Sequence, residues 1–293
     1  MSQMVQTLIT GTLVGGLYAV FSLGLTLPWG LLRVLNFAHF AYVFLFAYIT
    51  YELAAVHHLD PLVALAVTIP FGALLGIVTQ ALTSKASLDT FGTLIATFGL
   101  FLILQAAMSL YWTNDLVRIP LTDNPYFVRA WHVGPYTIPF VYACAFASAV
   151  VLCVGSYFLL ERSYTGKAIR AAVQDPQIAA AFGVNRVRVS YLIAGVAGTS
   201  AAVAGGFLAM LFALTPSGAQ GWVAVVFASV LLGGLGNPRG TLGAAIIVGV
   251  AEAMTQRYVD PTLAKLTPLA LLIVMLLVRP TGLFRPAVRI GQT

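Results

Sequence analysis

Long apolar runs separated by short polar stretches are the feature that most constrains how this chain can fold. The first run, residues 5–27, has no charged residue and ends at Pro28-Trp29-Gly30, where a helix breaker and an interfacial aromatic residue suit a membrane boundary. About 20 apolar residues in an α-helix span the roughly 30 Å hydrocarbon core of a bilayer. The chain is 60% hydrophobic and 8% charged, whereas soluble domains are roughly 45–50% apolar and 25% charged. A soluble globule is therefore excluded.

We predict an all-α fold: a polytopic integral membrane helical bundle with eight or nine transmembrane helices. No polar stretch is long enough for a separate soluble domain, so residues 1–293 are predicted to form a single transmembrane domain. No basic residue precedes Arg33, so the first run should remain as a helix and not be cleaved as a signal peptide. Residues 222–256 are either two short helices joined by a turn or a broken, re-entrant segment. The candidate helices are residues 5–27, 36–56, 62–82, 90–112, 138–160, 189–213, 222–236, 241–256 and 266–278.

The basic residues predict the orientation, because cytoplasmic loops hold an excess of Lys and Arg. The loop at 161–188 carries five of them and is placed in the cytoplasm, which puts the N-terminus outside and the C-terminus inside. The net charge of +6 is spread over short loops with no compact basic face, so nucleic-acid binding is not expected. Eleven basic residues are assigned to the inside (Arg33, Lys85, Arg162, Lys167, Arg170, Arg186, Arg188, Arg239, Arg279, Arg285 and Arg289) and four to the outside (Arg118, Arg129, Arg257 and Lys265).

The cytoplasmic loop contains the most informative short segment. After Gly166 a helix-prone stretch runs to residue 174, and then Asp175 can cap a second helix in which Pro176 takes the first position. Gly183 is expected to end that helix. Its residues at i, i+3 and i+4 spacing, Ile178, Ala181 and Phe182, form an apolar face that must be covered. A helix this short is marginal alone in water, so the face packs either on this protein's own bundle or in a partner's groove.

The sequence predicts neither catalysis nor metal binding. Gly166-Lys167 lacks the earlier glycine of a phosphate-cradling loop, so the chain by itself should not hydrolyse ATP. There is no HExxH motif, no Ser-His-Asp set at membrane depth and no paired carboxylates. Cys144 and Cys153 lie nine residues apart in one apolar run and are interpreted as inert thiols, not metal ligands.

Few polar residues fall in the apolar runs. Asn36 and His39 open the second run at the inner membrane boundary, where Asn36 either caps a helix or, with His39, contributes to a gate. Gly233, Gly234 and Gly236 can allow close helix packing or local unwinding along the translocation path.

The acidic residues of the apolar runs, Glu52 and Glu252, lie near segment ends. Such positions argue against a proton relay through the midplane. We expect Glu52 to be interfacial and Glu252 to form a satisfied pair with Gln256 and Arg257, the alternative for Glu252 being a contact to a substrate. The outer loop at 113–137 should form a folded cap.

Four motifs resemble the permease subunits of branched-chain amino acid ATP-binding cassette importers. They are NFAHF at 36–40, GKAIRAAVQDPQIAAAFGVN at 166–185, GGLGNPRGTLGAAIIVGVAEAM at 233–254 and LLVRPTGLFR at 276–285. Their order and spacing hold over nearly the whole chain. The first motif commonly ends in glycine, and Phe40 replaces it here, which adds bulk beside the expected permeation path.

The resemblance implies a subunit in the bacterial inner membrane that works with several partners. These are a second permease, expected to be a different chain, two cytoplasmic ATPases that hold the ATP and Mg²⁺, and an extracytoplasmic solute-binding protein. Residues 166–183, including Arg170, stand where the family's ATPase-coupling region belongs. Permeases of this kind also handle urea and short amides. A secondary transporter would need an ion-coupling residue at the midplane, and a membrane enzyme or scaffold would not need the capped cytoplasmic helix.

Overall fold

The structure is a computed structural model that describes residues 2–86, 88–279 and 282–284. Its helices are α1 (Ser2–Leu27), α2 (Ala38–Tyr51), α3 (Pro61–Lys85), α4 (Thr90–Trp112), α5 (Phe140–Arg162), α6 (Tyr164–Gln174), α7 (Pro176–Ala181), α8 (Arg186–Leu211), α9 (Val223–Gly233), α10 (Pro238–Tyr258), α11 (Pro261–Ala264) and α12 (Thr267–Val278). Short π-helical segments, η1 (Pro28–Leu32) and η2 (Glu52–Val56), extend α1 and α2, and a 3-10 helix, η3 (Pro216–Trp222), precedes α9. Two strands, β1 (Ala130–Val133) and β2 (Tyr136–Pro139), form an antiparallel hairpin in which Ala130 lies opposite Pro139.

The predicted all-α membrane bundle is confirmed, with a lower count of full-length spans. Within the described residues seven helical segments are long and apolar enough to cross a membrane. They are α1 with η1, α2 with η2, α3, α4, α5, α8, and η3 with α9. Two of the predicted helices are not among them: α12 has only 12 residues, and α10 carries Arg239, Glu252 and Arg257. Residues 222–256 contain two helices, α9 and α10, joined by a tight turn.

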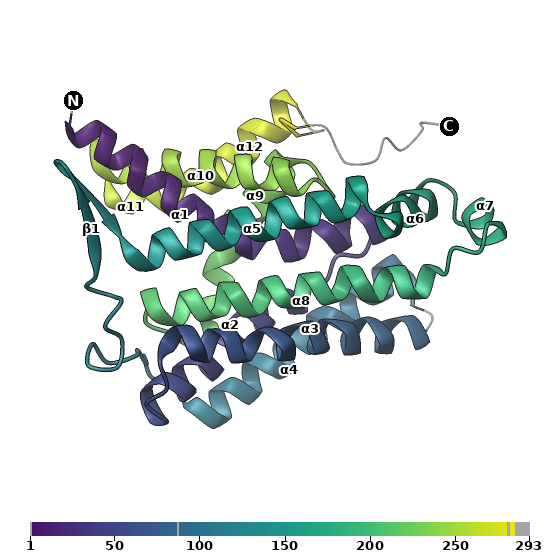
Figure 1. Ribbon diagram of the computed structural model, residues 1–293, viewed down its shortest axis with the longest axis horizontal. Helices are drawn as coiled ribbons and strands as arrows, with labels where there is room; N and C mark the ends of the chain where they lie inside the picture. The colour runs from purple at the N-terminus through teal and green to yellow at the C-terminus, as the bar shows by residue number, and fades with distance from the viewer. Residues whose placement is uncertain (1, 87, 280–281, 285–293) are drawn as a thin grey trace.

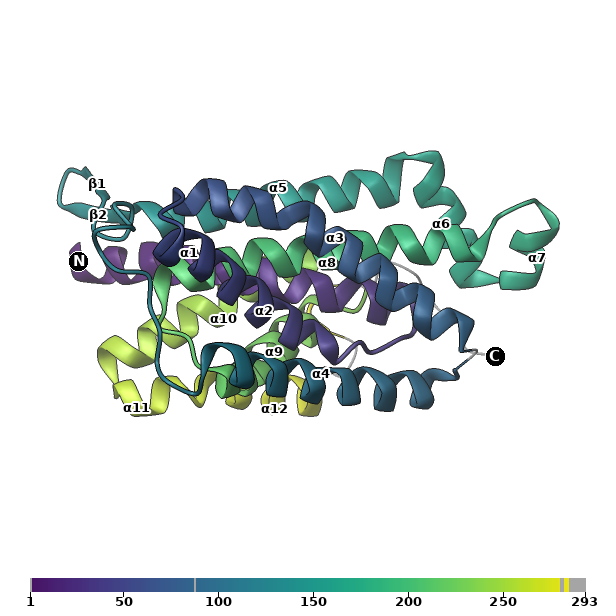
Figure 2. The same ribbon diagram turned by 90° about the horizontal axis from the view of Figure 1, so that it is seen from below.

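The helices run along the long axis of the molecule, so that loops gather at two ends (Figures 1 and 2). The start of α1, the β1–β2 hairpin and α11 lie at one end, and α6 and α7 lie at the other. Following the chain through this arrangement, the segments that carry nine of the eleven basic residues assigned to the inside lie toward the α6–α7 end, and the segments that carry the four others lie at the hairpin end. Arg285 and Arg289 fall outside the described residues. The two predicted groups of basic residues therefore lie toward opposite ends of the bundle.

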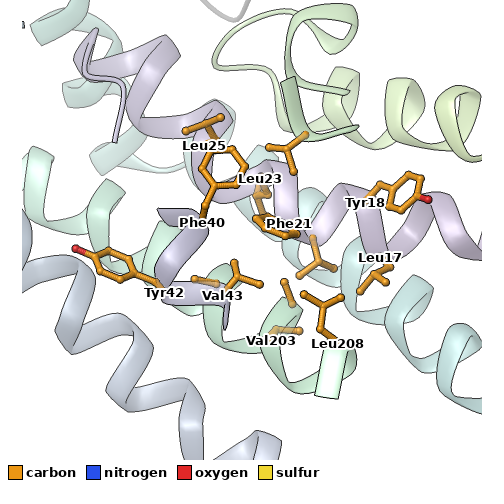
Figure 3. Packing of buried hydrophobic residues seen from close by; sticks show 14 of the residues in the cluster. Leu17, Tyr18, Phe21, Leu23, Leu25, Phe40, Tyr42, Val43, Val203 and Leu208 are labelled. Carbon is orange, nitrogen blue, oxygen red and sulfur yellow. The ribbon is translucent and has the colours of Figure 1, made fainter. Parts of the chain in front are cut away.

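Close packing of helix backbones holds the bundle together. A Cβ added at Gly15 of α1 would lie 2.6 Å from the Ile246 Cα of α10, and one at Gly72 of α3 would lie 2.5 Å from the Gly198 carbonyl oxygen of α8. In a bilayer, where lipid is as apolar as leucine, such close packing drives helix association. Large side chains of α1, α2 and α8 fill the centre, and Figure 3 shows Leu17, Phe21, Leu23, Phe40, Val43, Val203 and Leu208 converging there.

The loop at 113–137 forms a folded cap, as predicted. Asp60, which also caps α3, accepts a 2.7 Å hydrogen bond from the Tyr126 hydroxyl, and this bond raises the pKa of Tyr126. The Asn124 amide donates to the Met210 carbonyl at 3.0 Å. These contacts fasten the loop to the ends of α3 and α8.

Candidate functional site

The junction between α5 and α6 is held by contacts at the end of α5. Ser163 caps α6 by accepting a 2.9 Å hydrogen bond from the Gly166 amide. A side chain at residue 166 would meet the carbonyl oxygens of Leu159 and Leu160, so only glycine fits. Arg170 donates to the Leu160 carbonyl and forms a 3.2 Å ion pair with Glu161. Within the described chain Arg170 thus acts as a brace between α6 and the last turn of α5.

Helix α7 is capped at both ends, as the sequence predicts. The Asp175 carboxylate accepts hydrogen bonds of 3.0 Å from the amides of Gln177 and Ile178, and Pro176 is the first helical residue. At the other end Gly183 takes a left-handed conformation with φ +80°. The amides of residues 183 and 184 bond back to the carbonyls of residues 180 and 179 at 2.9 and 3.0 Å, which is the Schellman arrangement. The helix ends at Ala181, one residue earlier than predicted.

The apolar face of α7 is uncovered. Phe182 is 84% exposed and Ile178 58% exposed, and Ala181 beside them is exposed as well. Among the α7 side chains that the structure describes, Ala179, which lies beside Ile178 and outside this face, is the one that is buried. No described residue of the chain covers the face, so in the described part of the chain it does not pack on the bundle, which was the first of the two alternatives. This surface, Ile178, Ala181 and Phe182, is called the α7 face below.

His39 lies inside the chain, and Asn36 near it is partly buried. His39 is 1% exposed, its Nε2 lies 2.9 Å from the Phe21 carbonyl oxygen, and its ring rests against Gly24. Of the two alternatives for Asn36, the helix cap is wrong, because α2 begins after Phe37 without a side-chain cap, and the Asn36 Oδ1 has no partner among the described residues. The structure joins Asn36 and His39 in one small polar cavity, but a role in gating stays a prediction.

That cavity has a volume of about 20 Å³, enough for roughly one water molecule. It lies between α2, α3, α4 and α8 near the α6–α7 end, beside the non-helical segment at 33–37. Thr97 of α4 receives a 3.2 Å hydrogen bond from the Phe37 amide. The cavity is lined chiefly by uncharged polar side chains: Asn36, His39, Tyr42, Thr79, Gln80, Thr83, Thr93 and Thr97.

Gly233, Gly234 and Gly236 form the turn between α9 and α10. A Cβ at residue 233 would lie 2.6 Å from the Thr241 amide nitrogen, and Gly234 and Gly236 have φ of +81° and +75°. The Gly236 amide donates to the Thr26 carbonyl at 3.2 Å. All three glycines are buried in the single chain. Packing and turn geometry therefore explain them, and their place in the translocation path remains untested.

The predicted partners of Glu252 are wrong. Its carboxylate accepts a 2.7 Å hydrogen bond from the Tyr18 hydroxyl of α1, while Arg257 donates to the Gln3 amide oxygen at 3.0 Å. The periodicity of α10 could not indicate this, because Tyr18 comes from a distant part of the sequence. Glu52 accepts a 2.8 Å hydrogen bond from the Trp112 indole, near the hairpin end of both helices.

Phe40, the departure from the family's first motif, belongs to an aromatic cluster inside the bundle. Its ring lies 5.7 Å from Phe21 and 6.2 Å from Phe227, centroid to centroid. These rings come from α2, α1 and α9, and Phe40 itself is fully buried. In the single chain, its added bulk therefore fills core space.

Two parts of the structure escaped the sequence analysis. One is the start of α6, where Ser163 caps the helix and Arg170 pairs with Glu161. A serine three residues before a glycine that begins a helix-prone stretch was the available signal. The other is η3, most of which lies between the candidate helices predicted at 189–213 and 222–236.

Comparison with known proteins agrees with the motifs and the geometry. The family described as branched-chain amino acid transport system / permease component matches residues 7–276. The chain belongs to this family. It is 28% identical to the high-affinity branched-chain amino acid transport system permease protein BraD of Pseudomonas aeruginosa, over 97% of this chain and 96% of that protein. LivH of Salmonella typhimurium, a permease protein of the same description, is 26% identical with the same coverage of both chains.

Two more distant relatives are named as sugar import permeases. The fructose import permease protein FrcC of Rhizobium meliloti is 28% identical over 61% of this chain, and the ribose import permease protein RbsC of Escherichia coli is 25% identical over 65%. No solved structure gives a significant match to the chain. The family members are transport subunits, so this chain is a permease component of a transport system and not an enzyme.

Proposed function

We propose that the chain forms the translocation path of an ATP-binding cassette importer for branched-chain or related amino acids. The exposed α7 face is the observation that carries this proposal. A short helix with both ends capped, held away from the bundle by the α5–α6 brace, presents Ile178 and Phe182 at the end that is rich in Arg and Lys. Such a face is suited to insertion in an apolar groove of a partner. The partner proposed here is the importer's ATPase.

The complex we propose contains two ATPase subunits, a second and different permease chain, and an extracytoplasmic solute-binding protein. ATP and Mg²⁺ are held by the ATPases, and the coupling contact involves Gly166, Arg170, Asp175, Pro176, Ile178, Phe182 and Gly183. Of these, Ile178 and Phe182 make the contact, and the others shape and hold α7. The α6–α7 end faces the cytoplasm of a cell with a bacterial-type inner membrane, with the N-terminus outside and the C-terminus inside.

The proposed solute rests on how much of this chain each group of relatives matches. The relatives named for branched-chain amino acids match 97% of it, whereas those named for fructose and ribose match 61% and 65% respectively. Nothing among the described residues favours urea or short amides. A family of permease components also argues against an ion-coupled secondary transporter.

Uptake by the assembled importer tests the proposal. The chain is expressed with the ATPases, second permease and solute-binding protein encoded beside it, and reconstituted in vesicles. We expect ATP-dependent uptake of leucine, isoleucine or valine, and no ATPase activity from this chain purified alone. Uptake of ribose or urea without leucine would refute the proposed solute, and ATP hydrolysis by the chain alone would refute the division of labour.

The orientation is tested by cysteine labelling from outside intact cells. Leu121→Cys lies in the outer cap and Gln177→Cys in α7, and both positions are exposed. A membrane-impermeant thiol reagent should label residue 121, and should label residue 177 only after the cells are opened. The unsubstituted chain gives the background from Cys144 and Cys153. Labelling of residue 177 but not of residue 121 in intact cells would show that the orientation is the opposite of the one proposed.

A further inference from the structure

The chain between α8 and α9 enters the interior of the bundle from the hairpin end. Leu214 still lies at that end, where it exchanges hydrogen bonds of 3.0 and 2.7 Å with Val117 of the cap. Helix η3 then descends, and a 3-10 helix rises about 2 Å per residue, so its seven residues cover roughly 12 Å. Figure 1 shows this segment between the layer of α8 and the layer of α9 and α10.

Contacts place η3 at the middle of the membrane-spanning bundle. A Cβ at Gly218 would lie 2.8 Å from the Phe44 ring, halfway along α2. The Trp222 ring stacks on Phe21 at 5.7 Å, and Phe21 also contacts His39 near the start of α2. Helix α9 has only 11 residues, so its first residue lies about 15 Å from its last. Residues 216–222 therefore lie at membrane depth.

Helix η3 has one buried and one exposed face. A 3-10 helix repeats every three residues, and Pro216 and Ala219 are buried while Ser217 and Gln220 are exposed. Neither the Ser217 hydroxyl nor the Gln220 amide has a hydrogen-bond partner among the described residues. An unpaired amide in hydrocarbon costs several kcal/mol, and irregular backbone at membrane depth is found only inside protein or beside a water-filled cavity. This face therefore does not meet lipid.

We propose that Ser217 and Gln220 line the aqueous solute pathway of this permease and contact the solute as it passes. The inference rests on the proposed function and names a solute-contacting surface for it. The Gln220 amide can donate to a carboxylate and accept from an ammonium group, which are the two charged groups of an amino acid. Helix α4 contacts η3, and α12 contacts α9, so that these two helices flank the surface. The second permease subunit closes it from the open side.

Cysteine accessibility in the assembled importer tests the pathway. Ser217→Cys and Gln220→Cys are compared with Leu74→Cys and Ile103→Cys, apolar positions that are exposed on α3 and α4 and that we expect to face lipid. Thiols react as thiolates, which form in water and not in hydrocarbon, so an impermeant thiosulfonate should modify residues 217 and 220 at least about tenfold faster than the controls. Excess leucine with the solute-binding protein should slow modification of residue 220.

The outcomes separate the pathway from the solute. Fast modification of residues 217 and 220 supports the pathway even if leucine is not transported, and that result would refute only the proposed solute. Modification of residues 217 and 220 as slow as that of residues 74 and 103 would overturn the pathway. The pathway would also be overturned if Gln220→Cys formed a disulfide with the second permease but did not react with the impermeant reagent. Gln220→Leu should reduce uptake at least about tenfold with normal assembly, because the solute loses a paired polar contact. Unchanged uptake in Gln220→Leu would overturn the solute contact.

Discussion

Phe182→Asp should abolish uptake and the co-purification of ATPase subunits, while the permease still inserts in the membrane at normal levels. The substitution places a carboxylate at the centre of the α7 face, where the proposed complex buries Phe182 against apolar surface. Burying an unpaired charge costs several kcal/mol, and the complex can avoid this cost only by coming apart. Because Phe182 is 84% exposed in the single chain, the fold of the permease itself should not suffer. Uptake assays and affinity purification measure the two effects.

Two further variants of α7 are the controls for this experiment. Gln177→Asp adds the same charge next to Ile178 but outside the α7 face, at the helix N-terminus, where a negative charge is favourable, and should leave uptake unchanged. Asp175→Ala removes only the cap, at a cost of about 1 kcal/mol, and should weaken uptake and co-purification without abolishing them. Normal uptake by Phe182→Asp would show that α7 is not the coupling contact and that another loop has this role. Loss of uptake by Gln177→Asp would show that charge alone disrupts the segment.

Gly15→Leu should prevent the permease from folding to a stable monodisperse protein. The Cβ alone would lie 2.6 Å from the Ile246 Cα and 2.7 Å from the Ala245 carbonyl oxygen, so α1 and α10 must separate. Overpacking costs about 1–3 kcal/mol even where side chains can adjust, and here the neighbouring atoms are backbone. Fluorescence-detected size-exclusion chromatography after detergent extraction measures the expected loss of the folded peak.

Gly155→Leu is the matched control for Gly15→Leu. Gly155 is exposed on α5, and a Cβ there would meet no atom within 4 Å. The same substitution should therefore give a normal elution profile and normal uptake. A folded, active Gly15→Leu permease would mean that α1 and α10 do not pack as closely as described.

Local sequence patterns were enough to predict the helices and the two ends of the bundle. Apolar runs of membrane-spanning length predict helices because a helix satisfies its own backbone hydrogen bonds in lipid. The arrangement of Asp175, Pro176 and Gly183 predicted α7 for a similar reason, since caps involve residues only a few positions apart. The uneven division of Lys and Arg followed from short loops alone. All of these depend on interactions within a single segment.

The partners of polar residues and the path of the chain inside the bundle were decided by the tertiary structure. Glu252 bonds to Tyr18 and not to its helix neighbours, Asn36 opens into a cavity and does not cap α2, and Gly233 serves a helix contact. Helix η3, with its Pro and Gly residues typical of a loop, lies at membrane depth because neighbouring helices enclose one of its faces. Each of these outcomes depends on residues brought together from distant segments, and in lipid that choice is made by close packing, which no single segment encodes.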